Sequence, residues 1–505
     1  MSIGYETKPQ GGPRVGSGAA RARAIALLQA RRFAVLYAVL VAFLNVLAVV
    51  RNAYDLATVF ASLTLIVAMY PMYRWLKNRG ETEPLPFFPI VSLIYALYYG
   101  FSRFVPYDVY PRLIGVPEQY ITEASLLSFL SVAILVGSYH LWPARIRIKE
   151  IQPLSMYWSE QRARVVALAL APIGIGATVP ILAGYEGTAQ QLVYFASNLS
   201  FVAIAILFYL QIHKKLSIGY LTVLWGGLIP LTILINLSSG FLWTDIRLIV
   251  LLFMLYFAAK RAIPWRFVVV AIAIALILVP AMALKHEYRQ TYGVGGEELG
   301  INSLEDAVDR GVLFVDTVGG SFVQQGLQVY ETAASTLINR VDLIQLFAYV
   351  LQRTPETTPF LNGETYSDAP WKFVPRFIYP NKPEPNWGQL FGHRYGLLDP
   401  QDYDTSVNMP QMIEMYVNFG VLGLFIGMFL LAQLYRFLSY LLNHQGAGEW
   451  ITISGAVIFS NLTNIESNFL LVFGGILQWI VLLYLLGFLV HRRTKDQLHR
   501  NRKLM

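Results

Sequence analysis

The sequence predicts an all-α polytopic membrane protein with about twelve transmembrane helices and one large, partly helical loop on the outer side. The first reason is composition, because 55% of the residues are hydrophobic and only 14% are charged, whereas soluble domains carry about 25% charged residues. The second is the repeated occurrence of apolar runs close to the ~20 residues that cross a bilayer. The third is the concentration of Lys and Arg in alternate loops. Together they exclude a soluble enzyme and a disordered scaffold.

Twelve apolar runs can be read along the chain. They lie near residues 33–50, 55–73, 86–102, 123–142, 164–184, 190–211, 217–237, 242–259, 267–285, 411–435, 450–464 and 469–490. The polar stretch 1–32 does not resemble a signal peptide, because the first apolar run is followed directly by a second. The chain contains no cysteine, so disulfides, zinc–thiolate sites and thiol nucleophiles are excluded.

The distribution of charge predicts the orientation. If the N-terminus is cytoplasmic, that side of the membrane holds two thirds of all Lys and Arg but under a quarter of all Asp and Glu. This bias matches the positive-inside rule and places both termini in the cytoplasm. The net charge of +8 then belongs to membrane-flanking loops, and we expect no nucleic-acid partner.

The predicted domains follow from the spans. Residues 1–32 and 491–505 form basic cytoplasmic tails, 33–285 carry the first nine spans, 286–410 form the large outer loop, and 411–490 carry the last three spans. The loop holds twice as many acids as bases, and a loop of this length is usually functional. Ser303 to Asp306 forms a capping-box pattern that predicts a helix through about Val318. Helical periodicity recurs at 321–338 and 341–352, and the proline-rich stretch 371–387 predicts a rigid extended segment.

Cations at the outer membrane edge are the first candidates for a site. Arg247 follows a Ser/Gly-rich turn, residues 238–240, at the mouth of the eighth predicted span, and its planar guanidinium suits phosphate. Arg289 follows the ninth span by one helical turn. An arginine in either place can also be an interfacial side chain that reaches to lipid headgroups, or an ordinary charged exit from a span.

The large loop supplies further candidates. Arg376 and Lys382 lie among prolines beside the aromatic residues Tyr379 and Trp387, a combination that suits a sugar phosphate. A structural plug over the helices would use the same residues. Further candidates for substrate binding are Tyr366, Arg340 and Arg394.

Two residues are candidates for a general base. His393 offers an imidazole, a common general base, although single histidines are more often structural. Glu414 lies one turn inside the tenth predicted span, where a carboxylate is costly. The acidic turn at 399–404 lacks the glycine and distal glutamate of a calcium loop, so we expect no metal and no cofactor.

These features resemble the O-antigen polymerase (Wzy-type) and O-antigen ligase superfamily of bacterial glycan polymerases. The resemblance rests on the turn and arginine at 238–247, on the loop segments Gly363–Tyr366 and 373–383, and on the loop exit at 408–423, which includes Asn418-Phe-Gly420. Ligases of this superfamily carry a histidine where the loop re-enters the membrane. Residues 407–410 read Val-Asn-Met-Pro, so the resemblance favours a polymerase and leaves the general base open.

The resemblance implies a GT-C-like enzyme of the bacterial inner membrane with its active site facing the periplasm. It would transfer a glycan from undecaprenyl pyrophosphate to the end sugar of another lipid-linked repeat unit, for O-antigen or exopolysaccharide synthesis. Arg247, Arg289 and Arg376 would stabilise the pyrophosphate, and Glu414 or His393 would serve as the base. The resemblance also admits a chain-length regulator protein as a partner. Two alternatives stay open: a ligase or other lipid-linked glycosyltransferase, and a secondary transporter or flippase.

Overall fold

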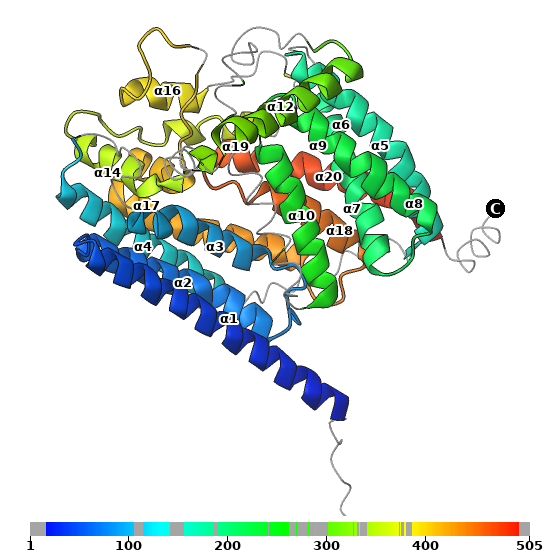
Figure 1. Ribbon diagram of the computed structural model, residues 1–505, viewed down its shortest axis with the longest axis horizontal. Coiled ribbons are helices and arrows are strands. Elements are labelled where there is room, and N and C mark those ends of the chain that lie inside the picture. Colours follow the sequence, from blue (N-terminus) through cyan, green and yellow to red (C-terminus); the bar gives the residue numbers. More distant parts are fainter. Residues whose placement is uncertain are drawn as a thin grey trace, which may run out of the picture.

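The protein is a bundle of helices, as the computed structural model in Figure 1 shows. The structure describes residues 17–105, 115–141, 156–185, 189–240, 242–261, 269, 281, 284, 288, 301–326, 328–330, 333, 341–372, 374, 378–379, 386–403 and 405–493. The helices before the large loop are α1 (Ser17–Val50), α2 (Leu56–Lys77), α3 (Phe87–Tyr99), α4 (Glu118–Leu141), α5 (Glu160–Leu182), α6 (Gln190–Ser197), α7 (Leu199–Ile212), α8 (Ile218–Thr222), α9 (Ile229–Leu237) and α10 (Trp243–Lys260). A 3₁₀ turn η1 (Phe101–Phe104) follows α3, and a π-helical segment η2 (Val223–Leu228) joins α8 to α9.

The large loop and the C-terminal part contain shorter and longer helices. They are α12 (Leu304–Gln325), α14 (Leu343–Arg353), the turn η3 (Glu364–Tyr366), α15 (Ala369–Lys372), α16 (Trp387–Arg394), α17 (Gln411–Leu442), α18 (Glu449–Asn461), α19 (Phe469–Phe473) and α20 (Ile476–Val490). The short strands β1 (Met156–Trp158) and β2 (His491–Arg493) pair antiparallel, with Met156 opposite Arg493.

Nine helical stretches within the described part of the chain are long and apolar enough to cross a membrane, so this is a helical membrane protein. They are Arg23–Val50, Leu56–Lys77, Phe87–Phe104, Glu118–Leu141, Glu160–Leu182, Gln190–Ile212, Ile218–Leu237, Gln411–Leu442 and Phe469–Val490. The three other predicted spans are not among these nine stretches. The one at 242–259 corresponds to α10, which carries three charged residues in 18, and the one at 450–464 corresponds to the 13-residue α18. The span at 267–285 lies almost wholly outside the described residues.

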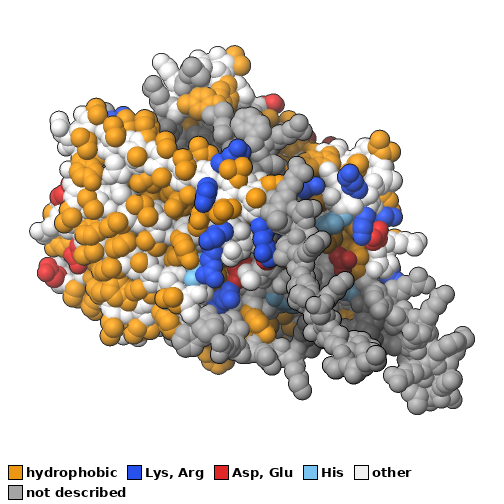
Figure 2. All heavy atoms as spheres, turned by 90° about the horizontal axis from the view of Figure 1, so that it is seen from below, with side chains coloured by type: hydrophobic (Ala, Val, Ile, Leu, Met, Phe, Trp, Pro, Cys, Tyr) orange, Lys and Arg blue, Asp and Glu red, His pale blue; other side chains and the backbone are white. Residues whose placement is uncertain are grey.

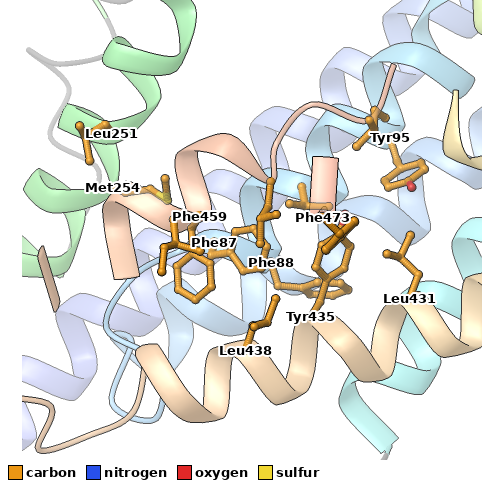
Figure 3. Packing of buried hydrophobic residues seen from close by; sticks show 14 of the residues in the cluster. Phe87, Phe88, Tyr95, Leu251, Met254, Leu431, Tyr435, Leu438, Phe459 and Phe473 are labelled. Atoms are coloured by element: carbon orange, nitrogen blue, oxygen red, sulfur yellow. The ribbon is translucent and has the colours of Figure 1, made fainter. Parts of the chain in front are cut away.

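The core is built from aromatic side chains of helices that are distant in the sequence. Figure 3 shows Phe87 and Phe88 of α3 between Tyr435 of α17 and Phe459 of α18. The rings of Phe87 and Phe459 stack with centroids 4.1 Å apart, and all four side chains are fully buried. Burial of large side chains in this way is what holds α3, α17 and α18 together.

The surface of the bundle is apolar where a bilayer would contact it. Leu36 and Val50 of α1 are 71% and 72% exposed, and Leu422 of α17 is 71% exposed. Figure 2 shows a broad apolar face with Lys and Arg side chains gathered at its edge. In water such a large apolar face would promote aggregation, whereas in lipid it is the expected exterior of the protein.

The described parts of the large loop dock on one end of the bundle, which we call the loop end. It carries α12 and α16, drawn in the upper part of Figure 1, and α14, drawn at its left. The predicted capping box is present: the Ser303 side chain accepts the backbone N–H of Asp306, and the Asp306 side chain accepts the backbone N–H of Ser303. The helix runs beyond Val318 to Gln325 and packs on α9 through Gly311, where a Cβ would lie 2.0 Å from the carbonyl oxygen of Leu234. The stretch 341–352 is helical as predicted, in α14.

The prediction of an extended segment at 371–387 is wrong at both ends. The first end belongs to α15 and the second begins α16, which Asn386 caps by accepting the backbone N–H of Gln389. A capping side chain satisfies an otherwise free donor, so a helix can begin directly after the prolines. Most of the residues between these two helices lie outside the described part.

Ion pairs fasten the bundle at both ends. At the loop end, the buried guanidinium of Arg103 contacts the carboxylates of Asp55 and Glu118. Partial burial raises the pKa of Asp55, but hydrogen bonds with Glu118 and Thr58 and the charge of Arg103 outweigh it, and the pKa falls to about 2. At the opposite end, Glu83 pairs with Arg436 and accepts a hydrogen bond from the Tyr139 hydroxyl.

Candidate functional site

The first element of the site is Arg247, which is held inside the loop end of the bundle. A tight turn precedes α10: Ser238 and Ser239 donate to backbone carbonyls of the preceding turn, and Gly240 adopts φ 65°. Arg247 is only 5% exposed. Its Nη1 donates to Asn461 Oδ1 at 2.7 Å and its Nη2 to Asn198 Oδ1 at 2.5 Å.

The charge of Arg247 has no direct counter-charge among the residues that the structure describes. No carboxylate of the described residues lies within 4.0 Å of the guanidinium, and the acid nearest in sequence, Asp245, instead accepts from Asn236 Nδ2 at 3.0 Å. The ring of Phe201 covers one face of the guanidinium at 4.0 Å, and the Tyr194 side chain lies close enough to interact. Nε has no acceptor within the described part of the chain. A buried cation held by neutral groups is costly unless an anion binds it.

The second element is Glu414, in the first turn of α17. The side chain is 0% exposed, and Oε2 accepts the backbone N–H of Phe469 at 2.6 Å. The Thr365 side chain approaches the carboxylate, while Oε1 has no hydrogen bond of normal length to any described residue. The carboxylate is therefore fixed at one oxygen and unsatisfied at the other.

Two motifs that are distant in the sequence meet beside Glu414. The helix α17 is broken at Gly420, which has φ 67° and ψ −159°. The side chain of Asn418 accepts the N–H of Gly363 at 2.9 Å and donates to Thr365 Oγ1 at 2.9 Å. The ring of Tyr366 stacks on that of Phe419, with centroids 6.2 Å apart. The segment Gly363–Tyr366 is thereby attached to the start of α17.

A polar connection joins Arg247 to Glu414. Residues 462–468 link α18 to α19, directly after Asn461, which binds Arg247. The carbonyl of Ile465 accepts from the N–H of Gln411, and Phe469, the next residue after the connection, binds Glu414. The connection also holds Glu466, whose pKa burial raises to about 7. We call residues 461–469 the bridging loop.

Sequence reasoning missed the bridging loop and Asn198. It placed a transmembrane span over 450–464, whereas α18 ends at Asn461. The signal was present in the run Asn461-Leu-Thr-Asn-Ile-Glu-Ser-Asn468, which is too polar for a span. Asn198 lies in an apolar stretch, and no local pattern indicates that it binds an arginine 49 residues away.

Two small pockets lie on the surface above this region, and Trp387 and Met409 line both. The first has a volume of about 110 Å³ and a polar lining of Lys372, Asn386, Ser406, Asn408, Ser467 and Asn468. The second has about 170 Å³ and includes Glu364, Phe391 and Arg394. Because Ser467 and Asn468 belong to the bridging loop, the first pocket is joined to the Glu414 centre.

The other predicted site residues are dispersed. His393 packs against the Tyr403 ring, 5.5 Å between centroids, and its Nε2 is without a hydrogen bond to any described residue. Tyr379 is 38% exposed beside Trp371. Arg394 lines the second pocket and donates to the carbonyl of Pro359 at 2.6 Å. Arg289, Arg340, Arg376 and Lys382 lie outside the described residues.

Comparison with known proteins assigns a family but no activity. Residues 144–493 match the pattern of a domain of unknown function, DUF8712, and this is more than half of the chain. The chain belongs to the DUF8712 family. No curated protein matches it, and neither does any solved structure. The DUF8712 region runs from before α5 to the end of α20, so it includes Arg247, Glu414, the bridging loop and both pockets, while α1 to α4 precede it.

Proposed function

We propose that this DUF8712 protein polymerises lipid-linked saccharide repeat units. The anomeric carbon of a sugar on a polyprenyl pyrophosphate, expected to be undecaprenyl pyrophosphate, would form a bond to a hydroxyl oxygen of a second repeat unit. The bond between that carbon and the pyrophosphate oxygen would break, and the pyrophosphate would keep the electron pair. This proposal includes the finer expectations of twelve spans, a GT-C-like arrangement and a periplasmic loop end in the bacterial inner membrane.

The observation that carries the proposal is the buried charge of Arg247 at the loop end, with which no described carboxylate pairs. The pyrophosphate gains negative charge as its bond to the sugar breaks, so a cation fixed in advance stabilises the transition state more than the ground state. Arg247 is fixed by Asn198, Asn461 and Phe201. All three are neutral, so they position the guanidinium without neutralising it, and Nε remains as a donor.

The acceptor hydroxyl must lose its proton, and Glu414 is the group we assign to accept it. Oε1 accepts no hydrogen bond of normal length from a described residue, and the bridging loop joins this carboxylate to Arg247. His393 is the second candidate, but it packs against Tyr403 on α16 and contacts neither centre in any described interaction. Donor and acceptor would both be lipid-linked, which agrees with a site at one end of membrane-crossing helices.

The test compares Arg247→Gln with Arg247→Lys and with a control, Arg353→Gln. Arg353 lies on α14 at the same end and stacks on Tyr349 at 3.6 Å, so its loss removes a cation of that end without touching the Arg247 centre. Each variant is expressed in a deletion strain, and polymer length is read on gels. Purified protein with lipid-linked repeat units gives the rate at which polyprenyl pyrophosphate is released.

We expect Arg247→Gln to lose about 10²–10³ in rate, as when one donor to a developing oxyanion is removed. Arg247→Lys should recover only part, because lysine has no planar fork, and Arg353→Gln should behave as wild type. Normal polymer from folded Arg247→Gln would refute the proposal. Transfer to a different lipid acceptor without chain growth would identify a ligase instead.

A further inference from the structure

The two surface pockets share one wall. Trp387 and Met409 line both, while the other lining residues differ. Local contacts fix the wall. Asn386 caps α16, and Gly388 lies so close to Ser406 that a Cβ on Gly388 would be 2.1 Å from Ser406 Oγ. Val407 N–H also donates to the carbonyl of Gly388 at 3.2 Å. The pockets are therefore part of the folded α16 region and do not depend on an induced opening.

The indole of Trp387 has an unused donor. The side chain is 9% exposed, and its Nε1–H has no acceptor among the residues that the structure describes. A buried indole N–H usually has a hydrogen-bond acceptor, because a buried donor without one has lost its hydrogen bonds to water and gained none in return. Trp387 lines both pockets, so a ligand that spans them would contact this residue.

The polar lining suits hydroxyl groups. Asn386 and Asn468 each cap a helix through Oδ1, so their NH₂ groups remain as donors at the first pocket, beside the hydroxyls of Ser406 and Ser467. The second pocket combines Glu364 and Arg394, an acceptor and a donor, with the ring of Phe391. Aromatic surface with amide and hydroxyl groups and charged groups of both signs is the chemistry that binds sugar rings.

We propose that these pockets bind two consecutive sugar rings of a glycan, across Trp387, with a carboxylate-bearing sugar in the pocket of Lys372. This inference rests on the proposed function, for which it names the class of acceptor. Each pocket is smaller than a typical ligand site and so takes one ring, not a whole repeat unit. Because the shared wall lies between them, one disaccharide occupies both.

The assignment of the acidic sugar comes from charge. Among the described residues that line the first pocket, Lys372 is the one that carries a charge. Its backbone carbonyl accepts a hydrogen bond from Gln478 Nε2 at 3.1 Å, which fixes the main chain at the wall of the pocket. Glu414 is 0% exposed, its Oε2 accepts the N–H of Phe469, and it is not among the residues that line this pocket. A cation at the wall favours a hexuronate over a hexose.

Binding can be measured without any lipid donor. Full-length protein in nanodiscs is titrated with two matched pairs, cellobiose with cellobiouronic acid and maltose with maltobiouronic acid, by calorimetry and saturation-transfer NMR. The variants are Trp387→Phe, which keeps a ring but removes the donor, Lys372→Gln, and the control Trp371→Phe. Trp371 is 45% exposed in the same part of the loop and lines neither pocket.

We expect millimolar binding, with at least one acid bound roughly two- to fivefold more tightly than its neutral counterpart, as for a solvent-exposed ion pair. Trp387→Phe should weaken both members of that pair by roughly three- to tenfold, the effect of one neutral hydrogen bond. Lys372→Gln should remove the preference for the acid and leave the neutral sugar unchanged, and Trp371→Phe should change nothing.

The inference is overturned if no pair binds to the wild-type protein, if Trp387→Phe binds as wild type, or if Lys372→Gln keeps the preference. The proposed function fails separately. If the binding results are as expected but Arg247→Gln still polymerises normally, the sugar site stands and the polymerase assignment does not. If Arg247→Gln is inactive and no sugar binds, the reverse holds.

Discussion

Replacing Asn461 by Asp distinguishes an anion-binding role of Arg247 from a purely structural one. The Asn461 oxygen is 2.7 Å from Arg247 Nη1, and aspartate has nearly the same shape. The substitution therefore gives the guanidinium a permanent counter-charge in place of a neutral acceptor. If Arg247 only supports the fold, the substitution should leave activity unchanged. If Arg247 binds an anion, the substitution should abolish activity.

The magnitude follows from the separation of the charges. Two unit charges about 4 Å apart interact by about 4 kcal/mol at an effective dielectric constant of 20. Burial of the new carboxylate costs several kcal/mol, so we expect the free energy of unfolding to change by no more than about 2 kcal/mol. A pyrophosphate, however, would lose most of that ~4 kcal/mol of attraction, which corresponds to roughly 10³ in rate or affinity.

The comparison variant is Asn461→Ala, which removes the acceptor without adding charge. It should destabilise the protein by about 1–3 kcal/mol, because a buried donor is left unsatisfied, and it should keep the larger part of the activity. The release of polyprenyl pyrophosphate by purified protein gives the activity, and thermal unfolding in the same detergent gives the stability. If Asn461→Asp were active and Asn461→Ala inactive, Arg247 would not be the anion site.

Three further outcomes are expected. Gly363→Ala should lower the unfolding temperature, because Gly363 has φ 91° and a Cβ would lie 2.9 Å from the Phe419 ring, a strain of about 1–2 kcal/mol. The control is Gly176→Ala, whose Cβ meets nothing within 4 Å. Equal effects of the two substitutions would contradict the docking of the segment Gly363–Tyr366. Burial raises the pKa of Glu466 to about 7, so the folded state loses stability as pH rises from about 4.3, the usual value, to 7. Glu466→Gln should therefore stabilise the protein little near pH 4 and most above pH 7, and a gain independent of pH would rule this out. Transfer should proceed in excess EDTA at the rate seen with magnesium, because Arg247 is a permanent cation; activity that is lost on chelation and restored by magnesium would show that a metal is needed.

The sequence was most informative where a local pattern carries the structure. Apolar runs predicted the helices that can cross a membrane, since a helix in lipid must satisfy its own backbone. The capping box at Ser303 and Asp306 predicted the start of α12, because both bonds lie within one turn. Arg247 and Glu414 could be selected because charge is rare in apolar surroundings. Prediction failed at residues 461–468 and at the helical ends of 371–387. Hydropathy averaged over a window does not reveal a short polar loop at the first place, and the prolines drew attention away from the capped helix at the second.

The sequence alone determined that this is a helical membrane protein with a few unusual charges near helix ends. Only the tertiary structure decided that Asn198 and Asn461 hold Arg247, that the segment Gly363–Tyr366 docks against Asn418, and that the bridging loop reaches Glu414. The reason is physical. Helix formation depends on residues three or four apart, whereas these hydrogen bonds join residues separated by 49 to 214 positions, and their geometry exists only after the helices have packed.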